Sequence, residues 1–202
     1  MTTSRREAIG FTVKSGWASV VLVAGSPTSP EILDSRRIEL SDPLVPKSRQ
    51  PYHEGFGTAR KEGAELSTLV ASVTRFGQQS VMELIQHFRS EGHELVGAGI
   101  VVGSLTPPGA IKNDHIRIHA LEGQLFRQVI EEGLVRSQMR SSVWRERDLY
   151  GRAADILKVP EKNLRDILAK LGEAVKKPWR LEQKAAALAA WLTLAEAKAQ
   201  GR

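Results

Sequence analysis

The sequence predicts an α/β fold in which a mixed five-stranded sheet carries helices on both faces. Three short strands separated by turn residues open the chain, and helical periodicity begins near residue 66. Beyond that point, helical and strand-like segments alternate. A meander of strands that leads into alternating helices and strands is typical of a mixed sheet with helices packed on it. A length of 202 residues suits one domain, so we expect residues 1–202 to form a single domain.

The first three strands are predicted from runs of β-favouring residues and from the turns between them. They cover residues 8–13, 17–25 and 31–40. The first turn, Lys14-Ser15-Gly16, contains a glycine that can adopt the positive φ of a tight turn. In the third strand, apolar and charged residues alternate, which is typical of a strand that is exposed on one face.

The middle of the chain is predicted to be a loop, a helix and a buried strand. Residues 41–65 contain three prolines and three glycines and are expected to form a long loop. Apolar residues recur at helical spacing over residues 66–90, with Gly77 as a weak point and Gly92 as the C′ residue. The nearly continuous apolar run at residues 95–103 predicts a central, parallel strand.

The remaining elements are two more helical regions around a weak strand. A second helix is predicted over residues 115–134, with Gly133 at its end. Weak alternation predicts the fifth strand within residues 136–151. Two strong helices follow at residues 160–175 and 180–199, and the last of them is rich in alanine.

Composition limits the classes of function. Lysine and arginine total 29 against 23 aspartates and glutamates, a formal charge of +6. This excess favours anionic partners, nucleic acid first, although many basic proteins simply keep a solvated surface. The absence of cysteine excludes disulfides, thiolate metal sites and cysteine nucleophiles. Because no signal-peptide pattern and no run of about 20 apolar residues occurs, we expect a cytoplasmic protein without a membrane partner.

The predicted order, β-β-β-α-β-α-β-α-α, resembles that of the ribonuclease H-like superfamily. Within it, the overall length and the terminal helices look most like Holliday-junction resolvases of the RuvC type. The resemblance implies acidic residues on the first strand, at the end of the fourth strand and near the start of the last helix. In such nucleases these acids hold two divalent metal ions that activate water and stabilise the leaving oxygen.

None of the residues at those positions is acidic: Thr12 on the first strand, Gly103 and Ser104 at the end of the fourth, and Gln183 and Ala186 on the last helix. Glu182 is the only acid near them, and one carboxylate does not hold two magnesium ions. We therefore expect a non-catalytic protein of this fold, with a binding or scaffolding role and with no catalytic residue, metal or cofactor. The actin and sugar-kinase ATPases, a second branch with this fold, also use an aspartate where Thr12 stands.

The rival hypothesis is a metal-dependent nuclease whose acids have moved to other positions. Its candidates are the acids that would have to meet in space: Asp34, Glu39, Asp114, Glu122 and Glu182. A third hypothesis is a self-associating protein. It rests on the smooth apolar face of the last helix, formed by Ala185, Leu188, Ala189 and Leu192.

Arginines interleaved with an aromatic residue carry the prediction of DNA or RNA binding. The candidate residues are Lys14, Arg136, Arg140, Arg145, Arg147, Arg152 and Trp144. Arginine and lysine suit phosphate contacts, and an aromatic ring suits base stacking. The alternative is an exposed strand whose arginines extend over apolar neighbours.

Three weaker patterns remain open. His115, His119 and Glu122 would share one helix face and could meet at a zinc ion, or they are surface and capping residues. His53 and Glu54 could do acid–base work, or they belong to a mixed polar loop. The glycines in "GAGIVVG" lie inside a strand, so they indicate close packing rather than a dinucleotide-binding loop.

Overall fold

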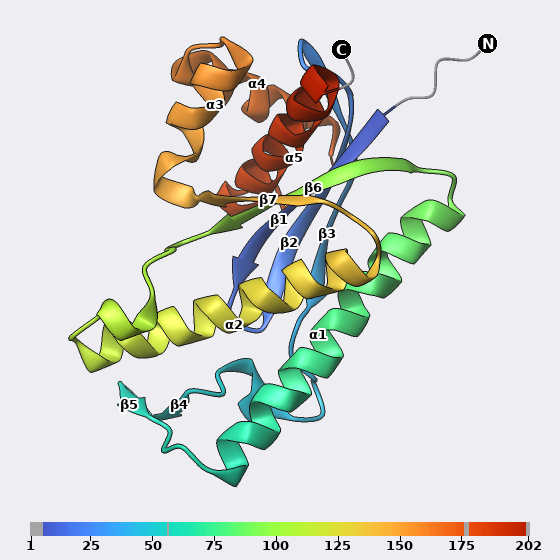
Figure 1. The fold of residues 1–202 in the computed structure, drawn as a ribbon. Coiled ribbons are helices and arrows are strands. Elements are labelled where there is room, and N and C mark those ends of the chain that lie inside the picture. The colour runs from blue at the N-terminus through green and yellow to red at the C-terminus, as the bar shows by residue number, and fades with distance from the viewer. Residues whose placement is uncertain (1–5, 56, 176–177, 201–202) are drawn as a thin grey trace.

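The computed structural model describes residues 6–55, 57–175 and 178–200 (Figure 1). Five strands form one sheet in the order β3-β2-β1-β6-β7. The strands are β1 (Arg6–Lys14), β2 (Trp17–Ser26), β3 (Ser29–Glu39), β6 (Glu94–Val102) and β7 (Ser141–Arg145). β2 is antiparallel to β1 and β3, whereas β6 is parallel to β1 and β7. The predicted mixed five-stranded sheet is confirmed.

Helices cover both faces of this sheet, as the sequence predicted (Figure 1). One face carries α1 (Ala64–Ser90) and α2 (Asp114–Arg136); the other carries α3 (Leu149–Leu157), α4 (Glu161–Leu171) and α5 (Leu181–Gln200). We call them the α1/α2 face and the α5 face. Alternation along β1 separates them, since Ile9 and Phe11 join the core under α1 and α2 while Ala8 joins the core under α5.

The α5 face is built from small residues that let a helix backbone touch the sheet. A methyl group added to Gly10 would lie 1.8 Å from the Ala186 carbonyl oxygen, and one added to Gly99 would lie 2.5 Å from that of Ala189. The strand glycines of "GAGIVVG" therefore serve close helix–sheet packing, as the sequence indicated.

This packing corrects the prediction of self-association through the last helix. Ala185 is 3% exposed, and Leu188, Ala189 and Leu192 are fully buried in the chain's own core. The apolar face of α5 meets β1, β2 and β6 of the same chain, so it is not a free surface for a second copy.

The two helices of the α1/α2 face begin and end close to their predicted limits, with one correction. α1 ends as predicted: Gly92 has a φ of +87°, and the His93 N–H donates to the Phe88 carbonyl. α2 continues past Gly133, and Gln138 (φ +56°) follows its C-terminus instead. Gly133 is kept small by packing, because an added methyl group would lie 2.8 Å from the Val81 Cβ on α1.

The predicted fifth strand is present but covers only a small part of residues 136–151. β7 covers only Ser141–Arg145, and Leu149–Leu157 form α3. Leu149 and Ala153 are both fully buried, and their i, i+4 spacing is that of a helix packed on one side. The long loop holds a small hairpin, β4 (His53–Gly55) and β5 (Thr58–Ala59), and a short 3-10 helix at Pro46–Arg49. None of the helices described is both long and apolar enough to cross a membrane.

Candidate nucleic-acid interface

The parallel strands β1, β6 and β7 end at the same edge of the sheet, which we call the carboxyl edge. β1 ends there at Lys14, β6 at Val102 and β7 at Arg145. Ligands of open α/β sheets bind outside the carboxyl ends of strands, so this edge is the first place to look for a site.

Thr12 occupies the position on β1 at which the resemblance implies an aspartate. Its side chain is 1% exposed, and its hydroxyl donates a hydrogen bond of 2.8 Å to the Glu182 carbonyl in the first turn of α5. Ser19 is its cross-strand neighbour, and the buried Ser19 hydroxyl has no hydrogen-bond partner among the described residues. Thr12 is thus a helix-packing residue whose only donor is already used.

The other strands also lack carboxylates at this place. Val101 faces α5 from β6, and its register partner Trp144 faces α5 from β7. At Gly10, two residues before Thr12, the α5 backbone lies so close to β1 that not even a methyl group would fit. In the part of the chain that the structure describes, no group of three or more histidines, aspartates or glutamates is arranged to hold a metal ion.

The relocated acids of the rival hypothesis do not meet. Asp34 pairs with Arg36 at 2.6 Å on β3, and Asp114 pairs with Arg117 at 2.9 Å at the start of α2. Glu39 lies at the end of β3, where it pairs with Arg37 at 2.6 Å. Glu122 is buried on the α1/α2 face, whereas Glu182 belongs to α5 on the opposite face. This set of five is therefore wrong as a metal centre.

The predicted basic residues are divided between the two edges of the sheet. Lys14 and Arg145 lie at the carboxyl edge, and Arg147 follows directly after β7. Arg136 ends α2 and Arg140 precedes β7, so both lie at the opposite edge. Arg152 is on α3, on the α5 face.

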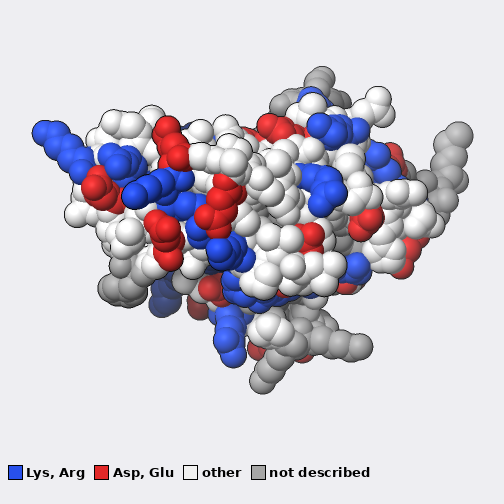
Figure 2. Space-filling model, turned by 90° about the horizontal axis from the view of Figure 1, so that it is seen from below, with Lys and Arg blue, Asp and Glu red and all other residues white. Residues whose placement is uncertain are grey.

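The basic residues at the carboxyl edge already have acidic neighbours. Lys14 lies 3.8 Å from Glu146, and Asp148 lies 2.5 Å from the Arg145 Nε and 3.5 Å from the Arg147 Nε. Three cations and two carboxylates leave one net positive charge in this group. Figure 2 shows the molecule from below, where basic and acidic side chains lie next to one another.

Trp144 is not arranged as an exposed stacking platform. Its ring packs against the core of the α5 face, and its buried indole N–H has no hydrogen-bond partner among the described residues. A partly buried ring can stack on a base only after it leaves this packing. The structure therefore places Trp144 near the carboxyl edge but not in a binding orientation.

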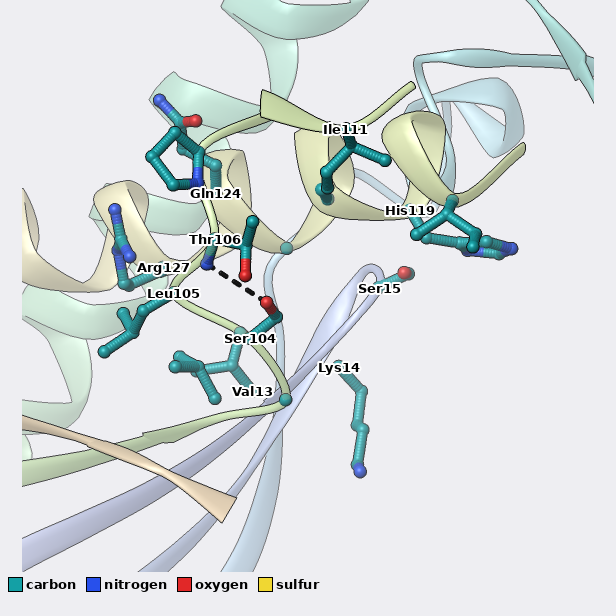
Figure 3. Close-up of a pocket in the computed structure, with 16 residues that line it drawn as sticks. Val13, Lys14, Ser15, Ser104, Leu105, Thr106, Ile111, His119, Gln124 and Arg127 are labelled. Carbon is teal, nitrogen blue, oxygen red and sulfur yellow. Dashed lines mark hydrogen bonds between the residues drawn. The ribbon is translucent and has the colours of Figure 1, made fainter. Parts of the chain in front are cut away.

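A pocket of about 530 Å³ lies between the carboxyl edge and α2 (Figure 3). Its polar lining includes Ser15, Ser104 and Thr106, and the Ser104 hydroxyl accepts a hydrogen bond of 3.1 Å from the Thr106 N–H. Arg127 contributes a cation from α2, whereas Lys14 points away from Ser104 and Thr106 (Figure 3). No acidic residue is among the described residues that line the pocket. Hydroxyls and a cation without carboxylates suit an anion better than a metal ion.

A second polar cluster lies under the start of α2. The Glu122 side chain is fully buried, and its Oε1 accepts a 2.9 Å hydrogen bond from the Tyr52 N–H and lies 3.2 Å from the His53 Nδ1. Burial raises the pKa of Glu122 to about 8. Burial, and then the nearby His119 and His115, lower the pKa of His53. The predicted His53–Glu54 pair is replaced by a contact with a glutamate 69 residues away.

The predicted histidine pattern on α2 is confirmed in part. The Nε2 atoms of His115 and His119 lie 3.2 Å apart, but Glu122 turns inward toward His53. The His53 ring lies 4.9 Å from that of His119. Sequence reasoning named the helix residues but missed their meeting with His53, because no local pattern reports a contact between a loop and a helix.

No protein-family model matches the sequence, and no curated protein matches it at a significant level. The structure, in contrast, is similar to that of Thermus thermophilus RuvC, with a TM-score of 0.58, 8% identity and 96% of each chain covered. T. thermophilus RuvC in complex with Holliday junction substrate gives a TM-score of 0.57 at 10% identity, again with 96% of each chain covered. The yeast mitochondrial Holliday junction resolvase Ydc2 gives 0.45 at 10% identity, over 98% of this chain and 83% of Ydc2.

The chain therefore has the ribonuclease H-like fold of RuvC, as the element order predicted. At identities of 8% and 10%, this likeness concerns the fold alone.

Proposed function

We propose that this protein binds nucleic acid at the carboxyl edge of its sheet and does not cleave it by metal-dependent hydrolysis. The absence of cleavage is inferred from the Thr12 hydroxyl, which donates a hydrogen bond to the Glu182 carbonyl where α5 packs on β1. Two-metal hydrolysis needs carboxylates that hold both ions in position beside the scissile bond. Thr12 has no carboxylate, and its hydroxyl proton is already donated to a helix carbonyl.

The chemistry of the edge supports the binding half. A phosphodiester backbone carries negative charge, and the pocket between β1, β6 and α2 is lined by Arg127 and three hydroxyls; the Arg127 Nε lies 3.4 Å from Glu131, which is not part of the lining. Lys14 lines this pocket and lies 3.8 Å from Glu146, and Arg147, which follows β7, lies 3.5 Å from Asp148. Ion pairs of this kind are weak, so a phosphate can displace the carboxylate.

Branched DNA is the first ligand to test, because the similar T. thermophilus RuvC has a structure with Holliday junction substrate. Fluorescence anisotropy of labelled four-way junction, duplex and single-stranded DNA at about 50 mM and about 200 mM salt measures the affinity and its salt dependence. We expect binding at the lower salt concentration that falls as salt rises. If no probe shows a rise in anisotropy at the lower salt concentration, nucleic-acid binding is contradicted.

Charge variants at the two edges locate the interface. We expect Lys14→Ala with Arg147→Ala to weaken binding and to reduce the slope of log affinity against log salt by about 1 for each lost phosphate contact. Arg136→Gln, at the opposite edge, is the matched control and should leave both unchanged. If Arg136→Gln lowers the affinity for nucleic acid as much, the interface does not lie at the carboxyl edge.

The same probes incubated with Mg²⁺ or Mn²⁺ test catalysis. We expect intact DNA on denaturing gels after prolonged incubation. Metal-dependent cleavage that stays with the wild-type protein through successive purification steps would overturn the non-catalytic proposal.

A further inference from the structure

We propose that a second pocket, between the 3-10 helix Pro46–Arg49 and the start of α2, binds a further phosphate group of the nucleic acid. We call it the loop pocket, and we call the pocket of about 530 Å³ between β1, β6 and α2 the carboxyl-edge pocket. The inference rests on the proposed function and deepens it, because it names a further segment of the chain that the nucleic acid contacts.

The loop pocket has a basic lining and a volume of about 690 Å³. Lys47, Arg49 and Arg60 line it against one carboxylate, that of Glu54. Glu65 is not part of the lining, and it lies 2.8 Å from the Lys47 Nζ and 3.1 Å from the Arg60 Nη1. Arginine and lysine bind phosphate oxygens through charge-assisted hydrogen bonds, so this lining suits an anion.

Arg49 carries the proposal because its charge is not compensated. Its side chain is exposed, and none of the acidic residues that the structure describes forms an ion pair with it. A guanidinium presents a planar fork of N–H donors that matches two oxygens of a phosphate. Lys47 lies in the same 3-10 helix, and its ion pair with Glu65 is exposed and therefore weak. We expect Arg49 to contact the phosphate and Lys47 to support it.

Arg60 gives the loop pocket a fixed shape. Its Nε donates a 2.9 Å hydrogen bond to the Pro51 carbonyl, and its Nη2 donates one of 2.8 Å to the His53 carbonyl. The Arg60 side chain is only 8% exposed, and its backbone N–H donates to the Tyr52 carbonyl at 2.8 Å. A binding surface that is already ordered loses less conformational entropy when a ligand binds. Arg60 is thus a positioning residue.

The loop pocket adjoins the carboxyl-edge pocket. His119 belongs to the lining of both. The Arg49 side chain also lies over the β1–β2 turn, because a methyl group added to Gly16 would lie 2.6 Å from the Arg49 Cγ. Ser15, the neighbour of Gly16, lines the carboxyl-edge pocket (Figure 3). The two pockets are therefore adjacent parts of one surface, and phosphates of a single strand can occupy both.

A charge variant of the loop pocket tests the contact. With the DNA probes described above, we expect Arg49→Gln to weaken binding and to reduce the slope of log affinity against log salt by about 1. Arg75→Gln is the matched control, because Arg75 is an exposed arginine of α1 that lines neither pocket. It should bind as the wild type does. Circular dichroism confirms that both variants are folded.

The absence of cysteine from the chain allows a direct test of proximity. Gln50→Cys places a single thiol in the lining of the loop pocket, and Gln79→Cys places one on the exposed surface of α1 as its control. A benzophenone is attached to each thiol and photolysed in the presence of the labelled probes. We expect DNA adducts with Gln50→Cys and only background with Gln79→Cys. Equal adduct yields would contradict the proposal.

Inorganic pyrophosphate tests whether the ligand is a small phosphate compound instead. Added at constant ionic strength, it should not bind the wild type saturably in isothermal titration, because a single pocket holds it without the contacts at the carboxyl edge. Saturable binding of pyrophosphate, together with no DNA adduct in Gln50→Cys, would overturn the proposal.

The two proposals fail in different ways. If the wild type binds no probe, nucleic-acid binding is contradicted and this inference falls with it. If Lys14→Ala with Arg147→Ala weakens binding while Arg49→Gln keeps the affinity and salt slope of the wild type, the carboxyl-edge interface stands and only the loop pocket is excluded.

Discussion

The two faces of the same sheet are packed by opposite means. On the α5 face, Gly10 and Gly99 meet alanine carbonyls of α5, so helix and strand backbones are in direct contact. On the α1/α2 face, large side chains such as Phe11, Phe88 and Phe126 separate the helices from the sheet. The buried polar cluster around Glu122 lies on this face, and two pockets are lined partly by residues of α2.

This difference supports the proposal that the protein does not act as a metal-dependent nuclease. Metal ions and carboxylates need room and solvation, and backbone-to-backbone packing supplies neither. Side chains can rearrange around a cavity, whereas a helix backbone seated on a strand moves only as a unit. The pockets beside α2 are of about 530 and 690 Å³, whereas a pocket of about 230 Å³ lies on the α5 face between β6, β7 and α5.

The largest effect is expected from Gly10→Ala. Its methyl group would lie 1.8 Å from the Ala186 carbonyl oxygen, so α5 must move away from β1. We expect the free energy of unfolding to fall by about 3 kcal/mol or more, at the upper end of overpacking costs. Urea denaturation measures it. Gly103→Ala is the control, because no atom lies within 4 Å of the added methyl group; equal stability of the two variants would contradict the close packing of α5.

Thr12→Asp is expected to have the next largest effect. A carboxylate at this 1% exposed position would lose the donated hydrogen bond and would face the Glu182 carbonyl oxygen. We expect a loss of about 3 kcal/mol, the cost of a buried polar group without a partner. Thr12→Val removes only the hydrogen bond and should cost about 1 kcal/mol. If Mg²⁺ raised the Tm of Thr12→Asp, the α5 face would have room for an ion after all.

Gly133→Ala tests the packing of the α1/α2 face. Here the methyl group would meet the Val81 side chain at 2.8 Å instead of a carbonyl group. Overpacking of about 2 kcal/mol, partly offset by about 1 kcal/mol of helix propensity, leaves a net loss of about 1 kcal/mol. Thermal unfolding of the two variants, Gly133→Ala and Gly10→Ala, compares their losses of stability. A greater loss for Gly133→Ala than for Gly10→Ala would reverse the ranking of the two faces.

The sequence predicted most of the fold because its evidence is local. Alternation and helical periodicity placed β1, β2, β3, β6 and four of the five helices, and Gly92 was named correctly as the end of α1. α3 was missed because the chain from residue 136 to 151 passes through a helix end, a turn, a short strand and a helix within a few residues. Gly133 was misread because a glycine near a helix end can serve either a cap or a close contact.

The candidate sites were predicted less completely, since they depend on contacts between distant segments. Arg136 and Arg145 are nine positions apart in the chain, yet they lie at opposite edges of the sheet. Ala185, Leu188, Ala189 and Leu192 form an apolar face of the last helix. Periodicity does not distinguish a face buried in the chain's own core from an exposed interface.

By itself, the sequence determined the order of the elements and the absence of carboxylates where the fold resemblance implies them, because residue types and their spacing are readable one by one. Only the tertiary structure decided that Thr12 bonds to a helix carbonyl 170 residues away and that His53 meets Glu122 across 69 residues. Such contacts arise when packing brings two faces together, and the sum of many weak interactions over the whole chain selects them.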